Sequence, residues 1–197
     1  PAGTFGSGPK LGSRTACLDC PIGYYCGKAT TWNSTRQCPA GRFGYLPKKV
    51  DFECDGACEP GHYCPAGSSR AHQQPCPAGR YNPSKEGRSL DSCAMCPLGE
   101  YCVEASVTPV ACSVYQSGSI NEYTTLGQGA TSAANCICKQ QYVGVPLDAF
   151  NQSRPLVECE ACSIEMSNCT ANGLQRDHMA VHEGHWRVNI NSTVVTA

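Results

Sequence analysis

The sequence predicts small disulfide-rich modules, irregular or β-hairpin in structure and with little helix, arranged in an elongated tandem array. The chain has 17 cysteines in 197 residues, which is far above ordinary usage and indicates a disulfide framework. Its 20 glycines and 14 prolines contrast with four phenylalanines and two tryptophans, so the apolar interior must be thin. One pattern also recurs at a constant spacing, from Pro1 to Pro39 and from Pro39 to Pro77, as it does in repeat proteins.

The repeating pattern is clearest between Cys76 and Cys102, which reads CPAGRYNPSKEGRSLDSCAMCPLGEYC. Seven of its positions recur at each of two earlier steps of equal length, with only Phe and Tyr interchanged. The three sets are Pro77, Gly79, Tyr81, Cys96, Gly99, Tyr101 and Cys102; Pro39, Gly41, Phe43, Cys58, Gly61, Tyr63 and Cys64; and Pro1, Gly3, Phe5, Cys20, Gly23, Tyr25 and Cys26. A unit of this size lies near the limit at which apolar burial alone stabilises a fold, so we expect covalent links.

The repeat divides the chain into five predicted segments. They are a cysteine-rich module at 1–37 without its first cysteine, two complete modules at 38–75 and 76–111, a divergent cysteine-rich segment at 112–169, and a cysteine-free tail at 170–197. The first module opens at Pro1, one residue after the position where the repeat requires a cysteine. We therefore expect the sequence to belong to a longer precursor.

Each module opens with Pro-Ala-Gly-x-aromatic. This combination specifies a tight turn, because Pro restricts φ and Gly adopts positive φ. We expect the turn to bring one aromatic side chain to the same place in each module, as a miniature core; these residues are Phe5, Phe43 and Tyr81. Three further aromatic residues, each directly before a cysteine, are expected to cover a disulfide; they are Tyr25, Tyr63 and Tyr101.

The two segments after the modules follow different patterns. Residues 113–135 are rich in Ser, Thr and Gly, and we expect a long loop closed by a disulfide. In the tail, Trp186, Val188 and Ile190 alternate with polar residues, which predicts a strand. Such a strand needs a partner, from the following segment or from another molecule.

Sequence alone does not determine how cysteines pair, but pairing neighbours in order uses every thiol except Cys17. The partner of Cys17 would be the cysteine expected before Pro1. The resulting pairs are Cys20–Cys26, Cys38–Cys54, Cys58–Cys64, Cys76–Cys93, Cys96–Cys102, Cys112–Cys136, Cys138–Cys159 and Cys162–Cys169. An interlaced scheme, with Cys54 bonded to Cys64 and Cys58 to Cys76, is the alternative; it leaves five cysteines over at the end.

Metal and redox sites are the other interpretations of these cysteines. The pairs Cys17/Cys20, Cys93/Cys96 and Cys159/Cys162 have the two-residue gap of such sites. Zinc sites at these pairs would leave the intervening cysteines without a role. A redox site is disfavoured because no strand-helix-strand pattern surrounds any of the pairs. We therefore favour disulfides. A histidine-rich cluster is one residue short of the metalloprotease signature and is interpreted as surface side chains; it comprises His178, His182, Glu183 and His185. We predict no catalytic, metal or cofactor site and no enzymatic activity.

Disulfides require an oxidising compartment, so we expect a secreted or cell-surface protein. Four N-glycosylation sequons agree with this location, and we expect N-linked glycans at Asn33, Asn151, Asn168 and Asn191. Fifteen basic and 16 acidic residues give a net charge of -1, which does not favour nucleic acid or an anionic membrane as a partner. No apolar run approaches the roughly 20 residues of a membrane helix.

The motif C-P-A-G-x-aromatic, followed after a spacer by C-x-x-C-P-x-G-x-Y-C, resembles the ephrin-receptor-like cysteine-rich repeat and, more distantly, the modules of tumour necrosis factor receptors. The likeness extends to about residue 162, because Cys136-Ile-Cys138 and Tyr142-Val-Gly144 resemble the segment that follows such repeats. The gap from Cys54 to Cys58 is one residue wider than is usual. The segment around Trp186 resembles those in large surface proteins of protists and algae.

The resemblance implies rod-like extracellular segments that space, adhere or assemble. We therefore expect an extracellular structural glycoprotein that joins like subunits or other extracellular proteins in a filament or surface coat, such as a flagellar hair. The alternative is a ligand-binding or adhesive ectodomain of a cell-surface receptor.

Overall fold

The computed structural model describes residues 1–6, 17–31, 35–112, 123–146, 157–162, 172, 186–187 and 195–196. The chain forms two compact units. The first unit comprises Pro1–Ala94 with Glu104–Thr108, and the second comprises Met95–Val103 with Pro109–Ala197. Among the described residues, no helix has the length and apolar character needed to cross a membrane.

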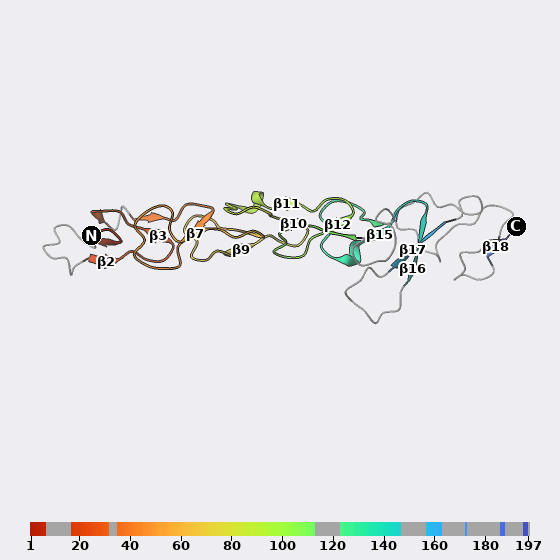
Figure 1. Ribbon diagram of the computed structural model, residues 1–197, viewed down its shortest axis with the longest axis horizontal. Helices are drawn as coiled ribbons and strands as arrows, with labels where there is room; N and C mark the ends of the chain where they lie inside the picture. Colours follow the sequence, from red (N-terminus) through yellow and green to blue (C-terminus); the bar gives the residue numbers. More distant parts are fainter. Residues whose placement is uncertain are drawn as a thin grey trace. The chain divides into compact units, whose positions relative to one another are not determined.

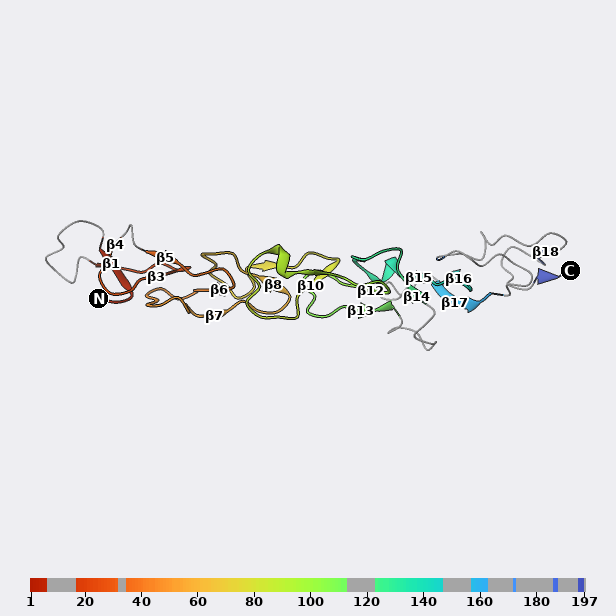
Figure 2. The same ribbon diagram turned by 90° about the horizontal axis from the view of Figure 1, so that it is seen from above.

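Short β-hairpins are the recurring element of the first unit, and they follow one another in chain order (Figures 1 and 2). Strand β1 pairs antiparallel with β2 and parallel with β4, while β3–β5, β6–β7 and β8–β9 are antiparallel pairs. The strands are β1 (Thr4–Gly6), β2 (Cys17–Asp19), β3 (Tyr24–Tyr25), β4 (Thr30–Thr31), β5 (Arg36–Gln37), β6 (Arg42–Phe43), β7 (Gly56–Ala57), β8 (His62–Tyr63), β9 (Gln74–Pro75) and β10 (Arg80–Tyr81). A 3-10 turn, η3 (Leu90–Ser92), precedes β11 (Ala94–Met95).

The second unit contains four antiparallel strand pairs among its described residues, and the longest, β16 with β17, joins Tyr142 to Ala161 and Pro146 to Val157. The pairs are β12 (Glu100–Tyr101) with β13 (Val110–Ala111), β14 (Tyr123–Thr124) with β15 (Ile137–Cys138), β16 (Tyr142–Pro146) with β17 (Val157–Ala161), and β18 (Trp186–Arg187) with β19 (Val195–Thr196). A 3-10 turn, η5 (Ala133–Asn135), precedes β15. The segment predicted as a long loop at 113–135 therefore contains a strand and a 3-10 turn within its described part.

The strand predicted in the tail also has a partner. Trp186 of β18 pairs with Thr196, and Arg187 pairs with Val195. Since β19 belongs to the same tail, β18 does not need a strand from another molecule. The rest of the predicted strand, from Val188 to Asn191, lies outside the described residues.

Seven disulfides join described cysteines, and each links two residues that the pairing in sequence order predicts. They are Cys20–Cys26, Cys38–Cys54, Cys58–Cys64, Cys76–Cys93, Cys96–Cys102, Cys112–Cys136 and Cys138–Cys159. The interlaced bonds from Cys54 to Cys64 and from Cys58 to Cys76 do not form. With only short strand pairs and no α-helix among the described residues, the prediction of disulfide-rich β-hairpin modules with little helix is confirmed.

Cystine sulfur forms most of the interior. The ten largest fully buried side chains of the described residues are all cysteines. Of the three aromatic residues expected as miniature cores, Phe5 is buried, whereas Phe43 and Tyr81 are half-buried. Tyr101 is also buried, whereas Tyr25 and Tyr63 are half-buried. A chain with so few large apolar side chains buries its disulfides most deeply, and most of its aromatic rings lie at the edge of that interior.

Candidate functional site at the repeat junctions

The contacts that join successive repeats begin at the Pro-x-Gly turns. In the turn at Pro39, the N–H of Arg42 donates to the Pro39 carbonyl over 3.0 Å, and Gly41 has a φ of +91°. This is a β-turn whose third residue needs positive φ, which is the reason for a glycine there. The same i to i+3 bond recurs at Pro21, Pro77 and Pro97. Each of these turns leads directly into the first strand of a hairpin.

The structural repeat is half as long as the repeat in the sequence. Each module contains two hairpins, and a Pro-x-Gly or Glu-Pro-Gly turn precedes the first strand of each hairpin. Besides the turn glycines, a residue with a left-handed backbone recurs at equal intervals along the described part of the modules. These residues, called here the left-handed series, are Ala29, Lys48, Gly67, Glu86 and Ala105, with φ between 59° and 80°. The sequence pattern did not reveal this shorter period, because only Gly67 among the five is a residue that signals positive φ.

Backbone hydrogen bonds connect each half-repeat to later ones. Four members of the left-handed series donate their N–H groups to carbonyls of earlier cysteines that precede a turn. The bonds are Lys48 to Cys20 (2.9 Å), Gly67 to Cys38 (2.8 Å), Glu86 to Cys58 (3.0 Å) and Ala105 to Cys76 (2.8 Å). The turn glycines donate in the opposite direction, to later residues: Gly3 to Cys26, Gly23 to Gly44, Gly41 to Cys64 and Gly61 to Asn82, over 2.7 to 2.8 Å. Because the backbone makes these bonds, they tolerate variation in side chains.

Close approach of the backbone is the second feature of each junction. A Cβ atom added to Gly41 would lie 2.7 Å from the carbonyl oxygen of Glu86, and one added to Gly3 would lie 2.6 Å from that of Lys48. Gly23 and Gly61 approach the carbonyls of Gly67 and Ala105 still more closely. The turn glycine is thus required for two reasons, a positive φ and the absence of a side chain. At each of these four glycines the opposing carbonyl belongs to the left-handed series.

Two ion pairs join consecutive modules beside these backbone contacts. The Arg42 guanidinium lies 2.9 Å from the Glu86 carboxylate, and the Lys48 ammonium lies 3.3 Å from the Asp19 carboxylate. The side chains of Lys48 and Asp19 are more than half exposed, so this pair contributes about 0 to 1 kcal/mol. The junctions therefore depend mainly on backbone geometry, with side-chain charges as a minor addition.

The wider gap from Cys54 to Cys58 is accommodated by a local change in the β6–β7 hairpin. Cys54 has a φ of +54°, and the extra residue Asp55 turns its carboxylate toward the N–H of Leu46 at 3.0 Å and the ammonium of Lys49. Burial of the Asp55 side chain raises its pKa, but the Leu46 N–H and Lys49 lower it by more, so the net pKa lies below its ordinary value. The additional residue thus forms a charged contact inside this loop.

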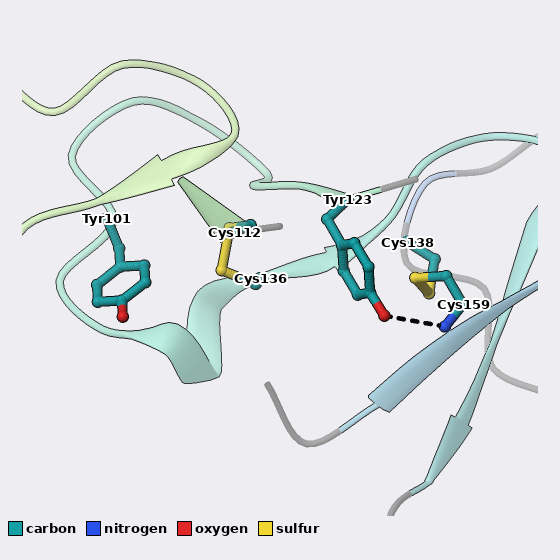
Figure 3. Close-up of a cluster of buried hydrophobic side chains, with 6 residues drawn as sticks. All are labelled: Tyr101, Cys112, Tyr123, Cys136, Cys138 and Cys159. Atoms are coloured by element: carbon teal, nitrogen blue, oxygen red, sulfur yellow. Dashed lines mark hydrogen bonds between the residues drawn. A yellow bond between two sulfur atoms is a disulfide. The ribbon is translucent and has the colours of Figure 1, made fainter. Parts of the chain in front are cut away.

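The second unit has its own buried cluster, formed by two disulfides and two tyrosines (Figure 3). The Cys112–Cys136 and Cys138–Cys159 bonds lie on either side of Tyr123, whose ring is 4% exposed. The N–H of Cys159 donates to the Tyr123 hydroxyl over 3.3 Å. This bond connects the β14–β15 hairpin to β17, so the divergent segment is tied together by a tyrosine as well as by sulfur.

The remaining predicted site residues have varied positions. Cys17 is a free, half-buried thiol, and Cys162 is disulfide-bonded. Several residues lie outside the described part of the chain: Cys169, the sequon residues Asn33, Asn151, Asn168 and Asn191, and the cluster of His178, His182, Glu183 and His185. Within the described part, no group of three or more His, Cys, Asp and Glu side chains is arranged to hold a metal ion.

Comparison with known proteins does not assign the chain to a family. No family model matches the sequence, and no curated protein matches it. What can be concluded from the residues and their geometry is a disulfide-rich protein whose repeats are joined through their backbones. Such a composition is compatible with an extracellular protein, because disulfides persist in oxidising compartments.

Proposed function

We propose that this protein is an extracellular structural glycoprotein whose repeats stack into a rod-like scaffold and assemble into a filament or surface coat. The junctions of the first unit carry the proposal. The left-handed series recurs at equal intervals, and the carbonyl groups of four of its members pack directly against turn glycines of earlier half-repeats. A contact repeated at equal intervals along the chain is what a stiff, extended array requires.

The local nature of the cross-links supports the same role. The seven disulfides join residues separated by 6 to 24 positions. Such bonds stabilise each half-repeat without a large common core, so repeats can be added in series. The resemblance of the motif to the ephrin-receptor-like repeat agrees with this role. Because β18 pairs with β19, the proposal relies on the repeats for assembly and not on strand exchange by the tail.

The test is electron microscopy of the purified, glycosylated protein over a range of concentrations. We expect extended particles that associate end to end or side by side as the concentration rises. Compact monodisperse monomers at high concentration would contradict the scaffold. A Gly41→Ala variant, which obstructs one junction, should shorten or bend the particles, whereas Gly27→Ala should not, because nothing lies within 4 Å of a Cβ at Gly27.

The proposal also specifies the chemistry of the surface. N-linked glycans at the four sequons would increase the mass, and no catalytic activity, cofactor or membrane contact is part of the role. Intact mass before and after glycosidase treatment counts the glycans. If glycosidase does not change the mass of protein secreted from eukaryotic cells, the protein is not N-glycosylated. The scaffold function would then still be tested by electron microscopy.

A receptor-type ectodomain is the second candidate, and one observation favours it. The loop closed by Cys38–Cys54 exposes four large apolar side chains: Tyr45 (57%), Leu46 (45%), Val50 (48%) and Phe52 (58%). Exposed apolar and aromatic side chains gathered in one loop are typical of protein-binding surfaces. A pull-down that recovers a stoichiometric protein ligand, lost on Tyr45→Ser and Phe52→Ser but retained on Leu126→Ser, would favour this function over the scaffold.

A further inference from the structure

Two histidines of the second module lie side by side on one hairpin. His62 belongs to β8, and His72 stands two residues before β9, the strand that pairs with β8. Their ring centroids are 5.6 Å apart, and the ring planes are inclined by 55°. His62 is half-buried, while the His72 side chain is 60% exposed. The two rings therefore form a pair that solvent and dissolved ions can reach.

Each imidazole has one nitrogen held by an oxygen acceptor. Nδ1 of His62 lies 3.1 Å from the carbonyl oxygen of Pro60, and Nδ1 of His72 lies 3.2 Å from a carboxylate oxygen of Glu59. A carbonyl and an ionised carboxylate only accept hydrogen bonds, so Nδ1 carries the proton in both rings. In the neutral imidazoles Nε2 then keeps its lone pair. This tautomer and this type of support are common in histidines that bind metal ions.

The spacing of the rings suits a shared ion. Two imidazoles that bind one ion through Nε2, at about 2.0 to 2.1 Å and a tetrahedral angle, place their centroids about 5 Å apart. The observed centroid separation of 5.6 Å is close to this value. Imidazole nitrogen is a preferred ligand of Zn²⁺, Ni²⁺ and Cu²⁺, whereas Ca²⁺ and Mg²⁺ prefer oxygen.

We propose that His62 and His72 bind one divalent transition-metal ion through their Nε2 atoms, with Glu59 as a positioning residue. The described residues contain no group of three metal-binding side chains, so this part of the chain supplies two ligands, and water occupies the remaining positions. The Glu59 carboxylate holds the His72 ring in orientation through Nδ1 and increases the basicity of Nε2. This site is independent of the proposed scaffold function.

The experiment measures Zn²⁺ and Ni²⁺ binding to the disulfide-bonded protein by calorimetry, together with ¹⁵N spectra of the histidine side chains. We expect His72→Gln to remove one bound ion per chain, and His62→Gln to do the same. In the wild type, the Nε2 signals of both residues should shift on addition of Zn²⁺ while the Nδ1 signals stay protonated. Glu59→Gln should weaken binding by about tenfold without removing the ion.

Controls distinguish this site from the other three histidines of the chain, His178, His182 and His185. A variant with these three changed to Gln should retain the ion, and Glu100→Gln, which removes another carboxylate, should bind as the wild type does. The proposal is overturned if His72→Gln binds as many ions as the wild type with equal affinity, or if the triple variant binds none. Intact mass and circular dichroism of each variant verify that the fold and disulfides are retained.

Discussion

At the scale of single residues, the junctions depend on where the backbone is left-handed. Glycine occupies some of these positions, but Lys48, Glu86, Ala29 and Ala105 occupy others. A left-handed backbone costs a residue with a side chain about 1 to 2 kcal/mol. Lys48, Glu86 and Ala105 each donate their N–H to a cysteine carbonyl. These hydrogen bonds offset part of the cost of the left-handed backbone. These residues keep a strained backbone because the tertiary hydrogen bond holds it in the left-handed conformation.

Three Gly→Ala substitutions distinguish the two requirements for glycine at the junctions, a positive φ and the absence of a side chain. Gly23 and Gly67 have nearly the same φ, 76° and 80°, but a Cβ at Gly23 meets a backbone carbonyl while one at Gly67 meets the flexible Gln37 side chain. We expect Gly67→Ala to lower the free energy of unfolding by about 1 to 2 kcal/mol and Gly23→Ala to lower it by about 3 kcal/mol or more. Urea unfolding with the disulfides intact measures both. Gly27→Ala is the control, and equal losses at Gly23 and Gly67 would contradict the role of the carbonyl.

Tyr123 offers a test in the second unit. Removing its hydroxyl with Tyr123→Phe leaves the buried N–H of Cys159 without this acceptor, which costs about 1 to 3 kcal/mol. The free energy of unfolding should fall by that amount, and amide exchange at Cys159 should become faster. Tyr45→Phe, at a ring that is 57% exposed, should change neither quantity. Unchanged exchange at Cys159 would refute the bond.

At the scale of elements, each hairpin is too short to be stable alone, since an isolated two-stranded hairpin is marginal in water. Most strands here contain only two or three residues. Each hairpin is stabilised instead by a nearby disulfide and by a backbone hydrogen bond to the next half-repeat. The β6–β7 hairpin adds a charged contact, the carboxylate of Asp55 with Lys49 and the Leu46 N–H.

The lowered pKa of Asp55 predicts how the stability of this hairpin changes with pH. Since the folded state favours the carboxylate, its contribution is complete above the ordinary pKa of 3.8 and is lost as the pH falls through the lower folded value. Thermal unfolding from pH 7 to pH 2 should therefore show a smaller acid-induced loss in Asp55→Asn than in the wild type. Asp51→Asn, in the same loop, is the control. An Asp55→Asn variant with the acid profile of the wild type would contradict the assignment.

At the scale of the whole molecule, covalent links replace a hydrophobic core. In the chain-entropy model, loops of 6 residues contribute about 2 kcal/mol and loops of 16 or 17 residues about 3 kcal/mol each. Several such links are comparable with the entire net stability of an ordinary domain, about 5 to 15 kcal/mol. The buried cystines also take the place of large apolar side chains in the interior.

Reduction should therefore unfold the protein without any denaturant. After complete reduction, verified by mass, we expect loss of the hairpin signal in circular dichroism and rapid amide exchange throughout the described modules. Thiol titration of the unreduced, denatured protein should find few free thiols, Cys17 among them. A folded protein after complete reduction, or mostly free thiols before it, would contradict this account.

The three sequence repeats and their turn residues are evident from the amino-acid sequence, which also favoured the order in which the cysteines pair. These features are local: the bonded cysteines lie 6 to 24 residues apart, and a Pro-x-Gly turn forms from adjacent residues. The half-repeat was not predicted, although Pro-x-Gly occurs at Pro1, Pro21 and Pro39 at nearly equal spacings.

The residues that meet across the junctions could not be predicted from the sequence and became known from the three-dimensional structure. Lys48 and Glu86 have no intrinsic preference for a left-handed backbone, and hydrogen bonds to Cys20 and Cys58 hold them there. The pairing of β18 with β19 and the burial of cystines ahead of Phe43 were likewise not evident from the sequence pattern. The junction contacts depend on how residues of different half-repeats pack together, and spacing within a single module carries no information about that packing.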